Sequence, residues 1–196
     1  IALMKAKPVF VDIEPDTFNI NPTLIEAAIT KKTKAIMPVS LFGQPADLDL
    51  IQTIASKHNL KVIIDGAQSF GSTYNNISDS NLGDLSITSF FPSKPLGCYG
   101  DGGAVFTNNF DYAEKLKMLR VHGQEKRNHH KYIGIGGRMD TLQAAVLVAK
   151  LPYFAKELID RQKVAKLYSN SFSGILITPA IKVGRSSTWA QYTLKV

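Results

Sequence analysis

The chain has 196 residues, 44% hydrophobic and 20% charged, which is typical of one folded domain and excludes a disordered chain. No apolar stretch approaches the roughly 20 residues that span a bilayer, so we expect a cytoplasmic protein without a membrane segment. The single cysteine, Cys98, excludes an internal disulfide and a multi-cysteine metal site. The formal charge of +7 leaves open an acidic ligand, such as a nucleotide or a nucleic acid, or an acidic partner chain.

The first third of the chain alternates apolar runs with amphipathic segments. Residues 8–13 are predicted to form a buried strand, and a helix capped by Asn21 follows it. Residues 35–42 and 61–65 are predicted to be further strands, with a helix over residues 47–58 between them. Strand, helix, strand, helix, strand with short connections is typical of an α/β fold, in which helices flank a mostly parallel sheet.

Polar side chains follow two of these apolar runs. Asp65 and Gln68 come after the strand at residues 61–65, and Ser89 and Lys94 come at the end of the apolar run 85–90 and after it. Ligands of such sheets bind at the carboxyl ends of the strands. If the run at residues 85–90 is a strand parallel to the other, these side chains meet at one edge of the sheet.

Lys94 lies in a turn made of aromatic residues, prolines and glycines. An amine held beside aromatic rings loses part of its hydration, which favours the free amine that can attack a carbonyl. The alternative is an ordinary solvated loop lysine, because most lysines are exposed.

The second half is predicted to contain a helix from Asp111 to residue 119, a polar and basic segment, and a glycine-rich turn that carries Arg138. We expect no metal site, because the adjacent His129 and His130 do not share a helix face and no carboxylate or cysteine has ligand spacing.

The sequence then predicts a helix over residues 140–151, which Pro152 interrupts, and a second helix over residues 154–168. A strand over residues 188–196 is predicted to follow. We interpret residues 1–151 as a large domain that lacks its N-terminal part. Residues 152–196 are interpreted as a connector helix and the start of a truncated, smaller C-terminal domain.

The excess positive charge lies in the last third of the chain. Residues 131–196 carry ten basic and three acidic side chains, whereas residues 1–65 carry seven of each and residues 66–130 six of each. The lysines and arginines of this part recur at helical spacing without interleaved aromatics, which favours a solvated helix face over nucleic-acid binding.

A lysine amine, a carboxylate at a strand end and a flat wall suit an aldehyde cofactor with a pyridine ring. Asp65 could keep the pyridine nitrogen protonated. The small side chain of Ala67 would let the ring lie close to the backbone, and Ser89 could hydrogen-bond a phosphate.

The motifs Asp-x-Ala-Gln, Ser-Phe-x-x-x-Lys and Gly-Asp-Gly-Gly occur here in this order. With the segments at residues 41–47, 122–123 and 138–145, they make the chain resemble the DegT/DnrJ/EryC1/StrS family of nucleotide-sugar aminotransferases over nearly its whole length.

The resemblance implies the large domain of a fold-type-I transferase that uses pyridoxal 5'-phosphate. Lys94 would hold the cofactor and act as the general acid and base. Asp65 would pair with the ring nitrogen, Ala67 would pack on the ring face, Gln68 would contact the ring hydroxyl region and Ser89 would bind the phosphate. Arg138 would bind an acidic substrate or a phosphate, and the enzyme would be a homodimer with shared active sites.

The resemblance also implies glutamate as amino donor and a nucleotide-linked keto-sugar as acceptor. Residues 88–103 and 137–143 are most similar to the family members that act on UDP-2-acetamido-2-deoxy-3-oxo-hexuronate and make the 3-amino sugar of bacterial O-antigens. One departure is Gly136, where the family usually has an asparagine. The alternatives are another nucleotide keto-sugar, or a non-catalytic fragment that binds cofactor or a partner; the present chain alone is expected to be inactive.

Overall fold

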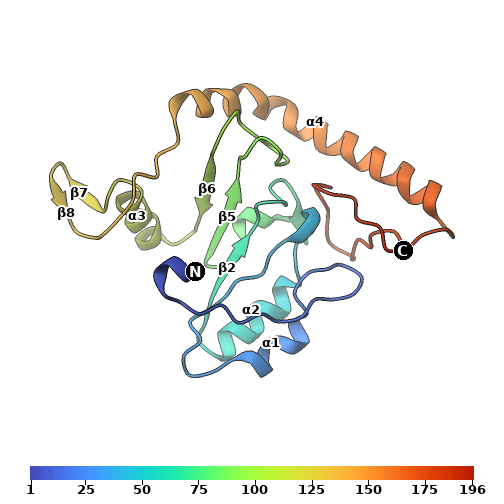
Figure 1. Cartoon of the computed structure of the whole chain (residues 1–196), viewed down its shortest axis with the longest axis horizontal. Helices are drawn as coiled ribbons and strands as arrows, with labels where there is room; N and C mark the ends of the chain where they lie inside the picture. Colours follow the sequence, from blue (N-terminus) through green and yellow to red (C-terminus); the bar gives the residue numbers. More distant parts are fainter.

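A computed structural model describes the whole chain, residues 1–196. Its central sheet has the strand order β1-β2-β5-β6 (Figure 1). The strands are β1 (Ala35–Ile36), β2 (Lys61–Asp65), β5 (Leu85–Ser89) and β6 (Gly103–Phe106). The first three are parallel and β6 is antiparallel to β5. This architecture confirms the predicted α/β fold with a mostly parallel sheet.

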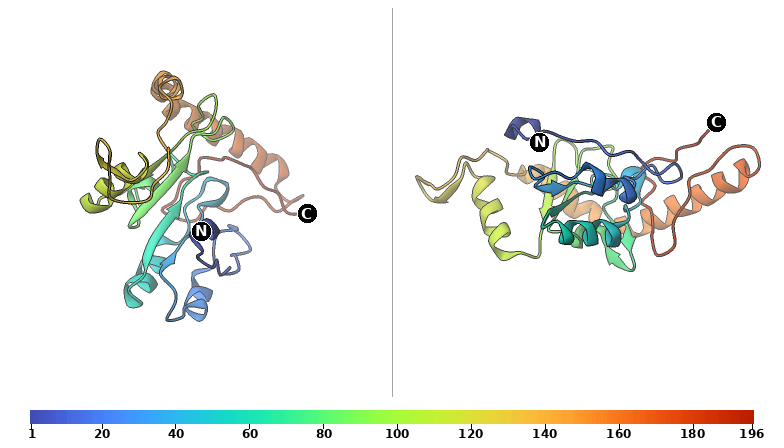
Figure 2. Two further views of the ribbon diagram at one scale, coloured as in Figure 1. Left: turned by 60° about the vertical axis from the view of Figure 1, so that its left-hand side comes forward. Right: turned by 90° about the horizontal axis from the view of Figure 1, so that it is seen from below.

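Two helices cover the first strands. Helix α1 (Pro22–Ala28) begins at Asn21, whose side chain accepts a hydrogen bond from the Thr23 amide as predicted, and α2 (Leu48–Lys57) follows β1. Ile51 of α2 and Ile64 of β2 are fully buried in the larger hydrophobic cluster. Both helices lie together on the side away from α4, as Figure 2 shows.

Short elements fill the connections. They are two hairpins, β3–β4 (Thr73–Tyr74 and Ile77–Ser78) and β7–β8 (Gln124–Lys126 and His129–His130), and three 3-10 turns, η1 (Ala2–Met4), η2 (Leu41–Gly43) and η3 (Asp79–Asn81). The polar, basic segment of the sequence thus forms the second hairpin, in which the two histidines face solvent. The residues of the whole chain form no cluster suited to a metal ion.

Two predicted strands in the first third of the chain are wrong in whole or in part. Residues 8–13 form no strand: the side chains of Val9 and Phe10 are 63% and 90% exposed, and only Ile13 makes a bridge, to Ile20. An apolar run becomes a strand only where a neighbouring strand accepts its hydrogen bonds, and none lies beside this one. The predicted strand at residues 35–42 is reduced to β1 and a bridge between Val39 and Asp65.

The helices of the second half differ from the prediction at their boundaries. Helix α3 (Phe110–Leu119) begins one residue earlier than predicted, because the Asn109 side chain caps it. Helix α4 (Thr141–Phe172) is continuous through Pro152, where two helices were predicted. Leu147 before the proline and Phe154 after it pack into the same cluster. This packing on both sides keeps the segment helical despite the lost backbone hydrogen bond.

The C-terminal tail after α4 runs back over the first part of the chain. The predicted strand at residues 188–196 is an irregular segment with one bridge, Ile177 to Lys195. Arg185 and Thr188 of this tail contact residues before position 70. The predicted domain boundary at residue 152 stays a prediction. None of the helices is both long and apolar enough to cross a bilayer.

Candidate active site

The carboxyl ends of β2 and β5 form the edge at which the predicted site residues lie. The two strands are parallel, and Asp65 at the end of β2 is paired with Ile87. Ser89 lies two residues further along β5, so both polar side chains belong to the same edge. In Figure 1 this edge faces the first half of α4, and the turn that carries Lys94 lies between them.

The turn after β2 orients Asp65. The Ala67 amide donates a hydrogen bond of 3.0 Å to Oδ1 of Asp65, and the Ser40 amide donates one of 3.0 Å to the Asp65 carbonyl. The second carboxylate oxygen, Oδ2, makes no hydrogen bond within the chain. One oxygen of Asp65 therefore fixes the side chain and the other is available to a ligand.

Gln68 is held at both its side chain and its backbone. Its Oε1 accepts a hydrogen bond of 2.6 Å from the Phe42 amide, which leaves Nε2 as a donor. Its carbonyl accepts a hydrogen bond of 2.5 Å from the hydroxyl of Thr188, a residue 1% exposed. Gly43 has φ of +113°, and a Cβ there would lie 2.4 Å from the Thr188 hydroxyl, so only glycine fits this approach.

Lys94 lies on the turn between β5 and β6. Its amide donates a hydrogen bond of 2.9 Å to the Phe91 carbonyl, and its side chain is half-buried without any hydrogen bond or ion pair. Directly after it, Leu96 and Cys98 are buried against Phe154 of α4. The Cys98 thiol donates to the carbonyls of Phe90 and Gly100, so this cysteine is a packed structural residue.

Two side chains of α4 support the same turn from outside. Oε1 of Gln143 accepts a hydrogen bond of 2.7 Å from the Tyr99 amide, and the Lys150 amine donates one of 2.5 Å to the Gly97 carbonyl. Gln143 and Lys150 are two helical turns apart and so lie on the same face. Helix α4 thereby fixes the turn that carries Lys94.

The groups at this edge fit the predicted cofactor. Ser89 accepts a hydrogen bond of 3.2 Å from the Phe91 amide and still has its own hydroxyl proton to donate, as a phosphate requires. The free Oδ2 of Asp65 suits a protonated ring nitrogen, and the unpaired amine of Lys94 suits an aldehyde. The residues present thus match a phosphorylated pyridine aldehyde in charge and hydrogen-bonding character.

Arg138 is the one predicted residue that the structure leaves apart. It is exposed at the start of α4 and makes no hydrogen bond or ion pair within the chain. Its neighbour Met139 packs against the cluster behind the Lys94 turn. The other five predicted residues lie on β2, on β5 and on the turns that follow these strands.

Sequence reasoning missed the residues that hold this edge from afar. Ser40, Phe42 and Thr188 support Asp65 and Gln68 through hydrogen bonds, and Gln143 and Lys150 support the Lys94 turn. Phe42 and Gln143 lie in segments that carry the family resemblance, but no local pattern marks the supporting role of these residues, because their partners are distant in the sequence. The one local signal that could have pointed to them is Gly43, since a glycine often marks a close backbone approach.

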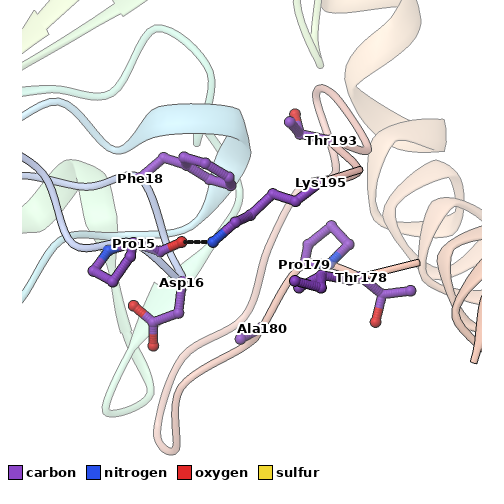
Figure 3. Close-up of a pocket in the computed structure, with 9 residues that line it drawn as sticks. Pro15, Asp16, Phe18, Thr178, Pro179, Ala180, Thr193 and Lys195 are labelled. Carbon is purple, nitrogen blue, oxygen red and sulfur yellow. Dashed lines mark hydrogen bonds between the residues drawn. The ribbon is translucent and has the colours of Figure 1, made fainter. Parts of the chain in front are cut away.

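A surface hollow lies elsewhere. It measures about 160 Å³ and is bordered by the turn at Pro15–Phe18 and by the C-terminal tail (Figure 3). The Lys195 amine crosses it and donates a hydrogen bond of 2.6 Å to the Pro15 carbonyl. None of the six predicted site residues lines it.

Comparison with known proteins identifies relatives over the whole chain. The model of the DegT/DnrJ/EryC1/StrS aminotransferase family matches residues 1–196. The UDP-2-acetamido-2-deoxy-3-oxo-D-glucuronate aminotransferase of Pseudomonas aeruginosa is 53% identical over 197 residues, which cover 100% of this chain and 55% of that protein.

Solved structures agree. A DegT/DnrJ/EryC1/StrS aminotransferase from Brucella abortus superposes with a TM-score of 0.96 at 41% identity, over 98% of this chain and 54% of that one. NtdA from Bacillus subtilis, solved with bound cofactor PMP, superposes with a TM-score of 0.87 at 33% identity, over 96% and 44%. The chain thus spans about half the length of the proteins that it matches.

Proposed function

Because the chain belongs to the DegT/DnrJ/EryC1/StrS aminotransferase family, we propose that it carries the cofactor-binding part of a sugar aminotransferase that uses pyridoxal 5'-phosphate. The observation that supports this proposal is that Asp65 and Ser89 end the neighbouring parallel strands β2 and β5, and that the turn carrying Lys94 follows β5. Bound there, the cofactor supplies an aldehyde and an electron-withdrawing ring that stabilises negative charge beside the transferred amino group.

The residues of the chain have distinct tasks in this proposal. Asp65, oriented by the Ala67 amide, accepts a hydrogen bond from the ring nitrogen and favours its protonated form. The small Ala67 leaves room for the ring, and Gln68 donates from Nε2 because its Oε1 is already occupied by Phe42. Ser89 donates its hydroxyl proton to the phosphate.

Lys94 would hold the cofactor through its amine, and the same amine, when free, would take up and return the proton at the substrate carbon. This task requires an amine that is not paired with a carboxylate and a backbone that is held in place. The absence of an ion pair at Lys94 supports the first requirement. The hydrogen bonds that its turn makes with Gln143 and Lys150 support the second.

For the substrates, we propose glutamate as amino donor and UDP-2-acetamido-2-deoxy-3-oxo-hexuronate as acceptor, in the synthesis of O-antigen or a related bacterial lipopolysaccharide. The relative from Pseudomonas aeruginosa supports this acceptor. Arg138 is proposed to bind the acceptor carboxylate or a phosphate. Since it is exposed and unpaired here, it is free to act in the active site of a second subunit, as a homodimer with shared sites requires. A cytoplasmic location is part of the proposal and agrees with the single, unpaired cysteine.

The test uses the full-length protein with added pyridoxal phosphate. We expect a visible absorption band of the lysine-bound cofactor that Lys94→Ala abolishes and that Lys166→Ala, an exposed and unpaired lysine of α4, leaves in place. Mass spectrometry should detect 2-oxoglutarate and an amino sugar from glutamate and the keto-hexuronate.

The acceptor is tested separately with Arg138→Met and with the corresponding keto-sugar that lacks the C6 carboxylate. We expect the variant to raise KM for the hexuronate and to have little effect on the neutral sugar. A cofactor band without any product from a panel of nucleotide keto-sugars would instead support a non-catalytic binding protein. A band that survives Lys94→Ala would refute the assignment of the lysine.

A further inference from the structure

A buried acidic residue lies directly beneath the turn that bears Asp65, Ala67 and Gln68. Asp79, the first residue of η3, is 1% exposed, and no lysine, arginine or histidine pairs with it. Its amide donates a hydrogen bond of 3.1 Å to the Ser72 carbonyl, which anchors it below the turn. A buried carboxyl group without a basic partner is costly and requires an explanation.

The carboxyl group contacts the turn at two points. Its Oδ2 accepts a hydrogen bond from the hydroxyl of Ser69, the residue after Gln68. It also lies against Gly66, the residue after Asp65: a Cβ at Gly66 would be 3.4 Å from Oδ2 and 3.3 Å from the Ser69 hydroxyl. Asp79 therefore supports the turn on both sides of Ala67.

The surrounding oxygens leave room for a protonated carboxyl group, which the burial of Asp79 favours. Oδ1 of Asp79 and the hydroxyl oxygens of Ser40 and Ser72 are all buried without a hydrogen-bond partner. Burial raises the pKa of Asp79, and the hydroxyls of Ser69 and Ser40 offset only part of this effect. A protonated Oδ1 would donate to the Ser40 hydroxyl, satisfying two of the three unpaired atoms. Ser40 also binds the Asp65 carbonyl through its amide, so the contact would extend to Asp65.

We infer that Asp79 is a positioning residue which, as a neutral acid, holds residues 65–69 in the conformation that binds the cofactor. This inference deepens the proposed function and rests on it for the identity of the ligand. It assigns to Asp79 no contact with the cofactor or the substrate.

The first test measures the turn itself and needs no cofactor. Hydrogen exchange is followed by mass spectrometry in peptides covering residues 65–72 of the cofactor-free, full-length protein. Asp79→Ala should speed exchange there at least about tenfold, because it removes a buried hydrogen-bond partner of the turn. Asp79→Asn should restore slow exchange, because its amide can accept from Ser69 and donate to Ser40. Asp111→Ala, an exposed aspartate of α3, is the control.

The second test measures cofactor binding. The dissociation constant of pyridoxal phosphate, measured by equilibrium dialysis, should rise about tenfold or more in Asp79→Ala and return to within about threefold of wild type in Asp79→Asn. The pH midpoint of the visible absorption band should shift in the alanine variant and return in the asparagine variant. A residue that only adds stability would lower the melting temperature and leave this midpoint unchanged.

Three outcomes are decisive. Unchanged exchange in Asp79→Ala overturns the inference, and so does an asparagine variant as impaired as the alanine variant, because the neutral form would then not suffice. If the wild-type protein binds no cofactor, the proposed function fails, whereas the exchange experiment still decides whether Asp79 positions the turn.

Discussion

Replacing Asn19 with alanine is expected to destabilise the protein by about 3 kcal/mol and to loosen the loop that holds Gln68. Asn19 is 1% exposed. Its Oδ1 accepts a hydrogen bond of 2.9 Å from the Leu41 amide, and its Nδ2 donates to the carbonyls of Gln44 (3.1 Å) and Pro45 (3.2 Å). One side chain thus satisfies three backbone groups of the loop at residues 41–45.

The magnitude follows from what the alanine would leave behind. An unpaired, largely buried Leu41 amide costs about 1–3 kcal/mol. The Nδ2 amide offers one N–H to each carbonyl, and the Pro45 carbonyl keeps a second hydrogen bond from Arg185. At about 0.5–1.5 kcal/mol for a hydrogen bond, their loss adds about 1 kcal/mol. Because the Phe42 amide binds Gln68, a displaced loop should also weaken cofactor binding.

Urea denaturation of the full-length variant, followed by circular dichroism, measures this effect. Asn170→Ala is the matched control, because Asn170 is an exposed residue of α4 without a side-chain hydrogen bond. Its unfolding free energy should stay within about 0.5 kcal/mol of wild type. A loss below about 1 kcal/mol for Asn19→Ala would show that water or a shift of the loop satisfies the three backbone groups, and would refute the reasoning.

Three further predictions concern other buried contacts. Arg185→Met should cost about 3 kcal/mol, because the 5% exposed side chain pairs with Asp47 at 3.2 Å and lies 5.0 Å from the Tyr74 ring centroid; a double-mutant cycle with Asp47→Asn that shows no coupling would contradict this. Gly123→Ala should destabilise the protein by well over the roughly 1 kcal/mol expected for Gly174→Ala. Both glycines have positive φ, but only at Gly123 would a Cβ clash with a carbonyl oxygen, that of Tyr132. Equal melting temperatures of the two variants would disprove the clash. Burial raises the pKa of Asp79, so the folded state binds a proton more tightly than the unfolded chain does. The unfolding free energy should therefore fall as the pH rises from about 4 to the raised pKa. Asp79→Asn should remove this dependence on pH, which denaturation curves measured between pH 4 and 8 would reveal.

Local patterns were enough to predict the strands and helices whose own sequence shows an apolar face that becomes buried. β2, α2 and β5 have periodic apolar residues and clear ends, and the structure has them at or within a residue or two of the predicted bounds. The prediction of secondary structure failed where the conformation of a segment depends on residues that are distant in the sequence. Residues 8–13 are apolar enough for a strand but have no strand beside them, and Pro152 does not end α4 because Leu147 and Phe154 pack into one cluster.

The candidate site divides in the same way. Asp65, Ser89 and Lys94 could be predicted because parallel strands bring their carboxyl ends to one edge, which is a rule of topology. The residues that support them could not. Asp79 follows a run of polar residues with no periodic pattern, and Thr188 lies 120 residues from Gln68, whose carbonyl it binds.

This division separates the groups that would touch the cofactor from those that would hold them still. The first lie on two short stretches, residues 65–68 and 89–94. The second come from residue 19 at one end of the chain and residue 188 at the other, and from α4 between them. A change in the C-terminal tail that breaks the Thr188 contact would therefore disturb Gln68 while every cofactor-binding residue remains in the sequence. Cofactor affinity should thus depend on the packing of the whole chain as much as on the motifs themselves.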